Sequence, residues 1–304
     1  MTEPSPSIDL ENASCAVKLY TFGAHITSFT VDGEEKLWMS SLSKMDGSAP
    51  IRGGIPLAFP QFADEGDLPL HGFARDSVWT VVSDETDGHD DDNTTVVLKL
   101  SDSERTRKIW PHAFELIYTV RLLERGLRVQ LTVKNSATRD GGGGGSFVFA
   151  GCFHTYLRFR DTSKVYLSGL DGVTYIDKAD GRKEKKAVQF LNVEVQANQS
   201  AKEAGIDHGF VDRIYLDSGN EFRFLDRPSE EIGKVLYHVE QSPTFTDTTI
   251  YNPWLGDKRG AAGPDFDDDG YKYTICCEPT LAKAHAVTLD GGETWEGFQV
   301  ITVP

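Results

Sequence analysis

Apolar and polar residues alternate along most of the chain. In residues 127–134, LRVQLTVK, every second side chain is apolar, as one face of a half-buried β-strand requires. Residues 114–122, FELIYTVRL, repeat the pattern. Turn-forming residues separate further segments of this kind, which are AVKLYTF, HITSFTV, VWTVVSD, TTVVLKL, SFVFAGCFHTYLRF, RIYLD, EFRFLD, KVLYHVE, TTIYNPW, YKYTICCE and FQVITV. The pattern predicts an all-β chain folded as a large antiparallel β-sandwich.

Helices and internal repeats are not predicted. No stretch above about twelve residues shows convincing helical periodicity, and no internal repeat occurs. The length allows one large all-β domain or two ordinary ones, and we expect a single domain over residues 1–304. A run of five glycines in residues 139–146, RDGGGGGS, has no side chains to bury and predicts a flexible insertion. A phosphate cradle is disfavoured there because no P-loop lysine follows. Residues 87–93, DGHDDDN, predict a solvated acidic connection.

The chain carries a net negative charge. Lys and Arg total 31 and Asp and Glu total 47, which gives -16 at pH 7. This charge disfavours nucleic acid and anionic membranes as partners, and any bound anion needs a local cationic pocket. Residues 1–14 lack the basic and apolar segments of a signal peptide, and no run approaches ~18 consecutive apolar residues. We expect a cytoplasmic protein that works as a monomer.

Neither the cysteines nor the acidic runs predict a metal site. The cysteines Cys15, Cys152, Cys276 and Cys277 show no CxxC spacing, which is typical of reduced, mostly buried thiols. Residues 265–270, DFDDDG, imitate the opening of a calcium loop, but the twelfth position counted from Asp265 is Cys276 and not the required glutamate. A plain acidic turn is therefore favoured, although cation binding there stays open.

The stretch LPLHGFARD, residues 68–76, is predicted to be a shaped loop. Pro69, Gly72 and two ionisable side chains make it a poor strand and a poor helix. A rigid scaffold can aim a titratable histidine and a fixed cation at a ligand, which makes His71 and Arg75 candidate functional residues. Arg52 stands on a second glycine turn, in IRGGIP.

Two ionisable residues stand inside apolar segments. His154 lies in the middle of CFHTYLRF, with Tyr156 and Arg158 expected on the same face. A hydrogen-bonded core histidine is one interpretation and a functional histidine is the other. Glu278 follows apolar residues and precedes Pro279, which predicts a strand end near the interior. An unpaired buried carboxylate costs several kcal/mol, so Glu278 needs donors or a raised pKa, and either marks a candidate base.

Several of these motifs occur together in one known family. The segments IRGGIPLAFPQFADEGDLPLHGFARDSVW, FHTYLRF, VDRIY, YNPW, CCEP and GGETWEG follow one another in this order. In that order they resemble the hexose-6-phosphate mutarotase branch of the aldose 1-epimerase family, from about YTFGAHITSF to the final strand. The resemblance implies a galactose-mutarotase-like β-sandwich (a supersandwich) with a sugar cleft on one concave sheet.

The resemblance also implies a role for each motif. His154 corresponds to the general acid of the family and Glu278 to its general base. His71, Asp212, Gln61 and Trp254 correspond to contacts with the sugar, and Arg52 and Arg75 to a pair that receives a phosphate. This chain departs from the branch in the glycine run and in residues 255–270, which puts the contacts of that loop in doubt.

The implied reaction is anomer exchange of a hexose 6-phosphate, as in a glucose-6-phosphate 1-epimerase. A pyranose ring opens when O1 loses a proton and O5 gains one, so a matched base and acid suffice and no metal or cofactor is needed. We expect Glu278 to be ionised and His154 to be cationic near neutral pH, since each charge favours the other.

Three other functions remain open on the sequence. A mutarotase for free aldoses would not direct the arginine pair into the cleft. A non-catalytic carbohydrate-binding protein would stack aromatic residues such as Trp254 on sugar and would not need the acid and base. A glycosidase needs two carboxyl groups about 5 to 9 Å apart, and a pairing of His154 with Glu278 speaks against it.

Overall fold

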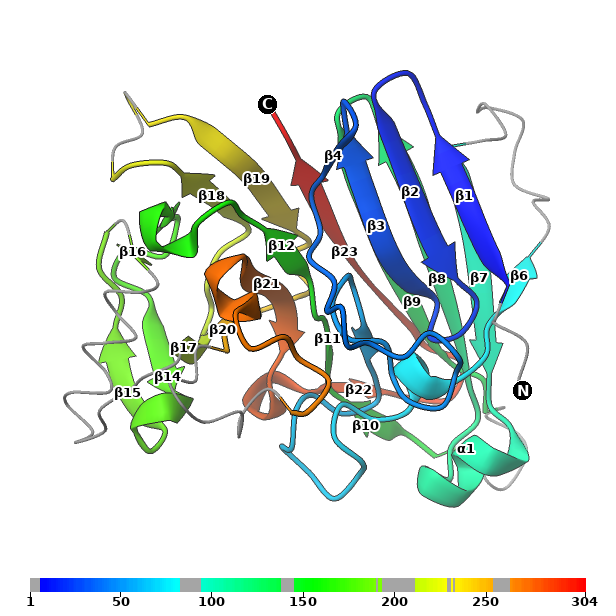
Figure 1. The fold of residues 1–304 in the computed structure, drawn as a ribbon. Coiled ribbons are helices and arrows are strands. Elements are labelled where there is room, and N and C mark those ends of the chain that lie inside the picture. The colour runs from blue at the N-terminus through cyan, green and yellow to red at the C-terminus, as the bar shows by residue number, and fades with distance from the viewer. Residues whose placement is uncertain are drawn as a thin grey trace.

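The computed structural model describes residues 6–82, 94–137, 145–189, 191–192, 211–228, 231, 233–253 and 263–304. These residues form large antiparallel sheets with few helical turns, as Figure 1 shows, so the predicted all-β fold is confirmed. The predicted acidic connection at 87–93 and most of the glycine run at 139–146 lie outside the described residues.

The strands of the described residues form four sheets. The largest has the order β16 (Leu191–Asn192), β13 (Tyr166–Ser168), β18 (Glu221–Leu225), β19 (Val235–Gln241), β23 (Thr294–Thr302), β9 (Gly126–Asn135), β8 (Phe114–Leu123), β7 (Thr95–Ser101) and β6 (Thr80–Val82). The second has the order β15 (Lys183–Lys186), β14 (Thr174–Asp177), β17 (Val211–Tyr215), β20 (Asp247–Asn252), β21 (Thr274–Leu281), β11 (Gly151–Phe153) and β5 (Leu57–Ala58), and β12 (Tyr156–Arg158) also pairs with β21.

Two smaller sheets complete the fold. One has the order β1 (Ser7–Glu11), β2 (Cys15–Tyr20), β3 (His25–Val31) and β4 (Glu34–Glu35), and the other pairs β10 (Phe147–Phe149) with β22 (Val287–Leu289). The helical turns are α1 (Glu104–Ile109), η1 (Ala74–Asp76), η2 (Thr162–Lys164), η3 (Lys178–Asp180), η4 (Gly270–Lys272) and η5 (Lys283–His285). No helix in the described part of the chain is long and apolar enough to cross a membrane.

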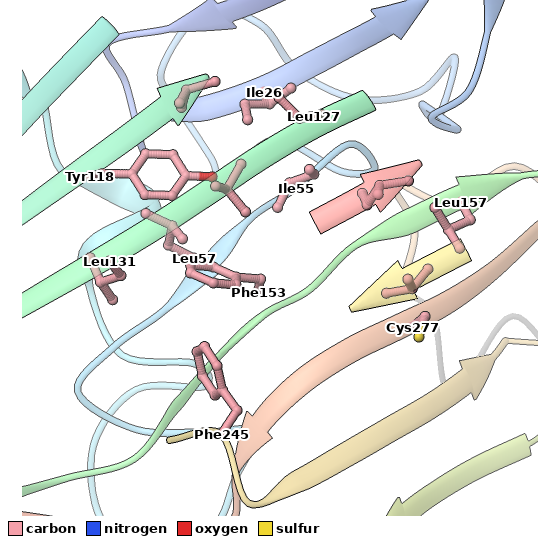
Figure 2. Close-up of a cluster of buried hydrophobic side chains, with 14 of the residues drawn as sticks. Ile26, Ile55, Leu57, Tyr118, Leu127, Leu131, Phe153, Leu157, Phe245 and Cys277 are labelled. Atoms are coloured by element: carbon pink, nitrogen blue, oxygen red, sulfur yellow. The ribbon is translucent and has the colours of Figure 1, made fainter. Parts of the chain in front are cut away.

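The hydrophobic core is lined by the two large sheets and by the four-stranded sheet. Figure 2 shows Tyr118 and Leu131 of the nine-stranded sheet, Phe153 and Cys277 of the eight-stranded sheet and Ile26 of β3 as parts of one buried cluster. The rings of Tyr118 and Phe153 lie 6.0 Å apart, and both side chains are fully buried. The alternation predicted for residues 127–134 therefore places one apolar row of β9 in this core. The same buried cluster contains residues from Leu10 to Ile301. A single domain would have such a cluster, but the domain organisation stays a prediction.

The segment at residues 146–159, expected to be one strand, is divided in the structure. β10 leaves to pair with β22, while β11 and β12 both pair with β21. Between β11 and β12 the Thr155 amide donates to the Phe153 carbonyl at 2.9 Å, which interrupts the ladder at His154. The expectation that His154 stands within a regular strand is therefore wrong. Tyr156 shares its surroundings, but Arg158 is exposed.

Candidate active site

The side chains of strand β21 point alternately into the main core and into a second, smaller cluster. Ile275 and Cys277 join the main core, whereas Cys276 packs with Trp38, Tyr156 and Phe266 in a separate cluster. Glu278 shares the face of Cys276 because side chains alternate along a strand. It is 1% exposed, so the prediction of a buried carboxyl group is confirmed.

The sequence predicted that the strand would end at Pro279, and this prediction is wrong. β21 continues to Leu281, and Pro279 pairs with Thr248 of β20. A proline has no amide proton to give to the neighbouring strand on its other side. That neighbour is the interrupted segment between β11 and β12, where the Phe153 carbonyl accepts the Thr155 amide instead. The break in one strand and the proline in the next therefore fit each other.

The same break places His154 across from Glu278. β11 pairs Cys152 with Thr280, and β12 pairs Tyr156 with Cys276 in the same register. Position 154, midway between 152 and 156, therefore faces position 278, midway between 280 and 276. The Nδ1 atom of His154 lies 3.3 Å from Oε1 of Glu278. This is ion-pair distance, but Nδ1 has no hydrogen-bond partner among the described residues.

Aromatic rings and a thiol hold the pair in place. His154 stacks on Tyr156 with ring centroids 4.7 Å apart and meets the edge of Tyr251 at 6.0 Å. The Cys152 thiol donates to Oε2 of Glu278 at 3.4 Å. Each oxygen of the carboxyl group thus faces a different side chain, which defines its orientation.

The pKa shifts of His154 and Glu278 differ from the expectation that both groups are charged. Burial, with the positive charges of Arg52 and Arg75, lowers the pKa of His154 to about 3. Burial, with the negative charge of Asp212, raises the pKa of Glu278 well above its usual range. Both directions place the proton of the pair on Glu278 and leave His154 neutral. Desolvation therefore outweighs the mutual attraction that the sequence argument relied on.

His71 lies beside the pair as a neutral donor. Its ring centroid is 5.3 Å from that of His154, and the φ angle of His71 is +61°. Burial, aided by the positive charge of Arg75, holds its pKa well below the ordinary value. Nδ1 accepts the Ala63 amide at 3.2 Å, so the proton of the neutral ring is on Nε2. The predicted loop at residues 68–76 thus presents one hydrogen-bond donor from His71.

The two predicted phosphate ligands act on each other electrostatically. Burial and the charge of Arg52 both lower the pKa of Arg75. Arg52 donates from Nε and Nη2 to the two carboxylate oxygens of Asp265, at 3.2 and 3.1 Å, and from Nη1 to the Tyr156 hydroxyl at 3.4 Å. Arg75 donates to the Leu70 carbonyl at 2.8 Å. Both cations are half-buried, and each has a partner within the protein.

The turn that carries Arg52 depends on glycine. Gly54 has a φ angle of +63°, and a Cβ atom there would lie 2.0 Å from the Ile26 carbonyl oxygen of β3. Gly33 has a φ angle of +76° but nothing within 4 Å. We expect Gly54→Ala to lower the free energy of unfolding by at least about 1 kcal/mol more than Gly33→Ala, because only Gly54 adds a backbone clash to the positive φ. Urea unfolding of both variants measures this, and equal losses would contradict it.

Lys178 is a residue of this site that the sequence did not single out. It belongs to η3, and its Nζ lies 3.2 Å from Oδ2 of Asp212. Both side chains are 18% exposed. Burial raises the pKa of Asp212, and Lys178 opposes that rise. A lysine in a short polar turn carries no periodic signal, so only the folded chain brings it to the predicted Asp212.

Two further residues, Gln61 and Trp254, are predicted to contact sugar. Gln61 donates to the carbonyls of Ala63 and Leu68 and accepts the Leu68 amide at 3.0 Å. These bonds use both ends of its amide to hold the loop that leads to His71, and its contact with sugar stays a prediction. Trp254 lies outside the described residues.

The acidic run at residues 265–270 is engaged in local contacts. Asp265 binds Arg52, Asp267 binds Ser41, and Asp269 lies 2.6 Å from Lys272. These partners favour the interpretation as a plain acidic turn. All four cysteines are free and buried, as predicted.

Comparison with known proteins identifies the family. Residues 6–302 match the aldose 1-epimerase family. The chain belongs to that family. A protein of Cenchrus ciliaris, provisionally named glucose-6-phosphate 1-epimerase, is 32% identical over 290 residues, which cover 93% of this chain and 80% of that protein. An Escherichia coli protein with the same provisional name is 31% identical over 86% of this chain and 78% of its own.

The aldose 1-epimerase fold is also evident from solved structures. A protein from Salmonella typhimurium, provisionally described as a mutarotase, superposes with a TM-score of 0.74 at 25% identity, and the match covers 98% of this chain and 90% of that one. A Synechocystis protein gives a TM-score of 0.75 at 21% identity over 100% and 97% of the two chains. The galactose-mutarotase-like β-sandwich implied by the sequence motifs is therefore confirmed.

Proposed function

We propose that this aldose 1-epimerase family member interconverts the α and β anomers of a hexose 6-phosphate, with glucose 6-phosphate as the first candidate. One observation carries the proposal: a buried imidazole and a buried carboxyl group lie 3.3 Å apart, and the positive charges of two arginines act on the imidazole. The provisional names of two relatives that are 32% and 31% identical point to the same substrate.

The proposed reaction moves two protons and breaks one ring bond. Glu278 removes the proton from O1 of the sugar while His154 gives a proton to O5, and the C1–O5 bond breaks to leave an open-chain aldehyde. Rotation about the C1–C2 bond turns the other face of the carbonyl toward O5. Closure reverses both transfers and restores the pair. His71 and Asp212 are proposed to bind hydroxyl groups of the sugar from the two sides of the pair.

The substrate itself is proposed to prepare the acid. The pair carries one exchangeable proton, which can occupy two positions. In the first arrangement the proton is on Glu278 and His154 is neutral; in the second, Glu278 is ionised and His154 is cationic. Arg52 and Arg75 disfavour the second arrangement because they repel a cationic imidazole. A phosphate dianion bound between these arginines would offset their charge and raise the pKa of His154. Binding of the phosphate therefore favours the charged pair that the reaction needs.

The alternative is a mutarotase for free aldoses, and it is favoured by the contacts that the two arginines already make within the protein. Asp265 already occupies two donors of Arg52, and Arg75 binds a backbone carbonyl. A phosphate would have to use the remaining guanidinium protons or displace these partners. If it does neither, the same acid and base would serve an unphosphorylated sugar.

Anomer exchange measured by NMR tests the proposal. Glucose 6-phosphate and free glucose are each equilibrated with the enzyme, and exchange between α and β signals is followed at matched concentrations. We expect faster exchange of the phosphorylated sugar at low substrate concentration, because the arginine pair adds binding energy. Equal or faster exchange of free glucose would favour the free-aldose alternative, and no enhancement of either would favour a binding protein.

A further inference from the structure

A third potential ligand stands beside the acid and the base. The Cys276 thiol, a ring nitrogen of His154 and a carboxylate oxygen of Glu278 all lie within 4.8 Å of one another. None of the three residues is more than 8% exposed. Cys276 and Glu278 reach the pocket from alternate positions of β21, and His154 reaches it from the break across from them. The trio is therefore a consequence of the strand register.

We propose that Cys276, His154 and Glu278 form a binding site for a thiophilic divalent cation such as Zn²⁺, which would block the pocket against sugar. The metal binding stands on the donor geometry alone, and only the block of turnover rests on the proposed function. Sulfur, imidazole nitrogen and carboxylate oxygen are the usual protein ligands of zinc. Three protein ligands with an open fourth position form the common arrangement of accessible zinc sites.

The distances suit a tetrahedral ion after small side-chain movements. Zinc bonds of about 2.0 to 2.3 Å place neighbouring ligand atoms about 3.3 to 3.8 Å apart. His154 Nδ1 and Glu278 Oε1 already lie 3.3 Å apart. The other separations reach at most 4.8 Å and must shrink by about an ångström. The Nδ1 atom of His154 has no hydrogen-bond partner among the described residues, so coordination at this atom would displace no such bond.

The charges around the site are compatible with a bound cation. Arg52, Arg75 and Lys178 act on His154 as positive charges, and Asp212 acts on Glu278 as a negative one. Zinc binding converts the thiol to a thiolate and the carboxylic acid to a carboxylate and releases two protons, while His154 stays neutral. Two negative ligands then balance the Zn²⁺ charge, so the neutral trio becomes a neutral complex. The surrounding cations consequently add little net repulsion.

The next residue of β21 supplies a matched control. Cys277 is fully buried like Cys276, but it belongs to the main core, where Figure 2 shows it. Cys277→Ala removes a thiol of the same strand without touching the proposed ligands. Cys276→Ala removes one ligand. Thermal unfolding followed by circular dichroism checks that both variants fold, and Cys276→Ser replaces Cys276→Ala if the latter does not.

Co²⁺ titration, with Zn²⁺ competition, tests the site. Cobalt bound to a thiolate absorbs in the near ultraviolet, which histidine and carboxylate sites elsewhere on the chain do not reproduce. We expect this band in the parent protein and in Cys277→Ala, its loss in Cys276→Ala, and its displacement by one equivalent of Zn²⁺. Zinc affinity measured by calorimetry should fall at least about tenfold in Cys276→Ala only.

Two results would overturn the proposal. These are a thiolate band that survives in Cys276→Ala, and a parent protein that shows no band at micromolar cobalt. If the parent also turns over glucose 6-phosphate, zinc should inhibit it, and excess substrate should relieve the inhibition. A protein that binds cobalt through Cys276 but exchanges no sugar would contradict the proposed function while leaving the metal site intact.

Discussion

Replacement of Glu278 by glutamine, or of His154 by asparagine, is expected to slow anomer exchange at least about a hundredfold, the usual scale for loss of a general base or acid. The two groups lie 3.3 Å apart, and in the proposed reaction each carries one of the two proton transfers, so neither can supply both alone. Each replacement keeps the approximate shape of the side chain, so sugar binding should largely survive. The loss should therefore appear in kcat, measured by NMR exchange at saturating substrate.

The controls are a histidine and a glutamate outside the pocket. His238 and Glu240 lie on β19 of the nine-stranded sheet, 3.6 Å from each other. His238→Asn and Glu240→Gln should leave the exchange rate unchanged. Near-normal exchange in folded His154→Asn or Glu278→Gln would remove that residue from its proposed role. A loss that appeared only in KM would make it a binding residue instead.

Arg75→Ala is expected to weaken the use of glucose 6-phosphate by about 2 to 4 kcal/mol in kcat/KM, because a charge-assisted contact in a cleft is lost. Free glucose should be affected little, since it has no phosphate to bind. The measurement is kcat/KM for both sugars in the parent and the variant. The difference between the two sugars, and not the loss on one of them, reports the phosphate contact.

Arg105 offers a matched control for Arg75. Its side chain is 50% exposed and pairs with Asp76 at 2.8 Å, next to Arg75 in the sequence. Arg105→Ala should change neither substrate, because exposed pairs contribute little. Equal losses on both sugars in Arg75→Ala would show that its bond to the Leu70 carbonyl supports the His71 loop and that no phosphate is held there.

Periodicity alone predicted the sheets, because it is a local property of the chain. Side chains of a strand alternate between two faces, so the apolar row of LRVQLTVK had to face a core, as it does in β9. Alternation also places Cys276 and Glu278 on one face of β21 and Cys277 on the other. Short or charged strands such as β15, with the sequence KEKK, escaped prediction because they bury too little apolar surface to show a pattern.

The order of the motifs revealed the family and singled out His154, Glu278, His71, Arg52, Arg75 and Asp212, because these residues stand in segments that are distinctive without any structure. Which of them meet, and with which other groups, only the tertiary structure decided. The register of β11 and β12 on β21 brings His154 to Glu278, and contacts between distant segments bring Asp265 to Arg52 and Lys178 to Asp212. The protonation of the acid and base also depends on the fold. Desolvation and neighbouring charges shift a pKa only once the chain has buried the group, and no local pattern of residues records that burial.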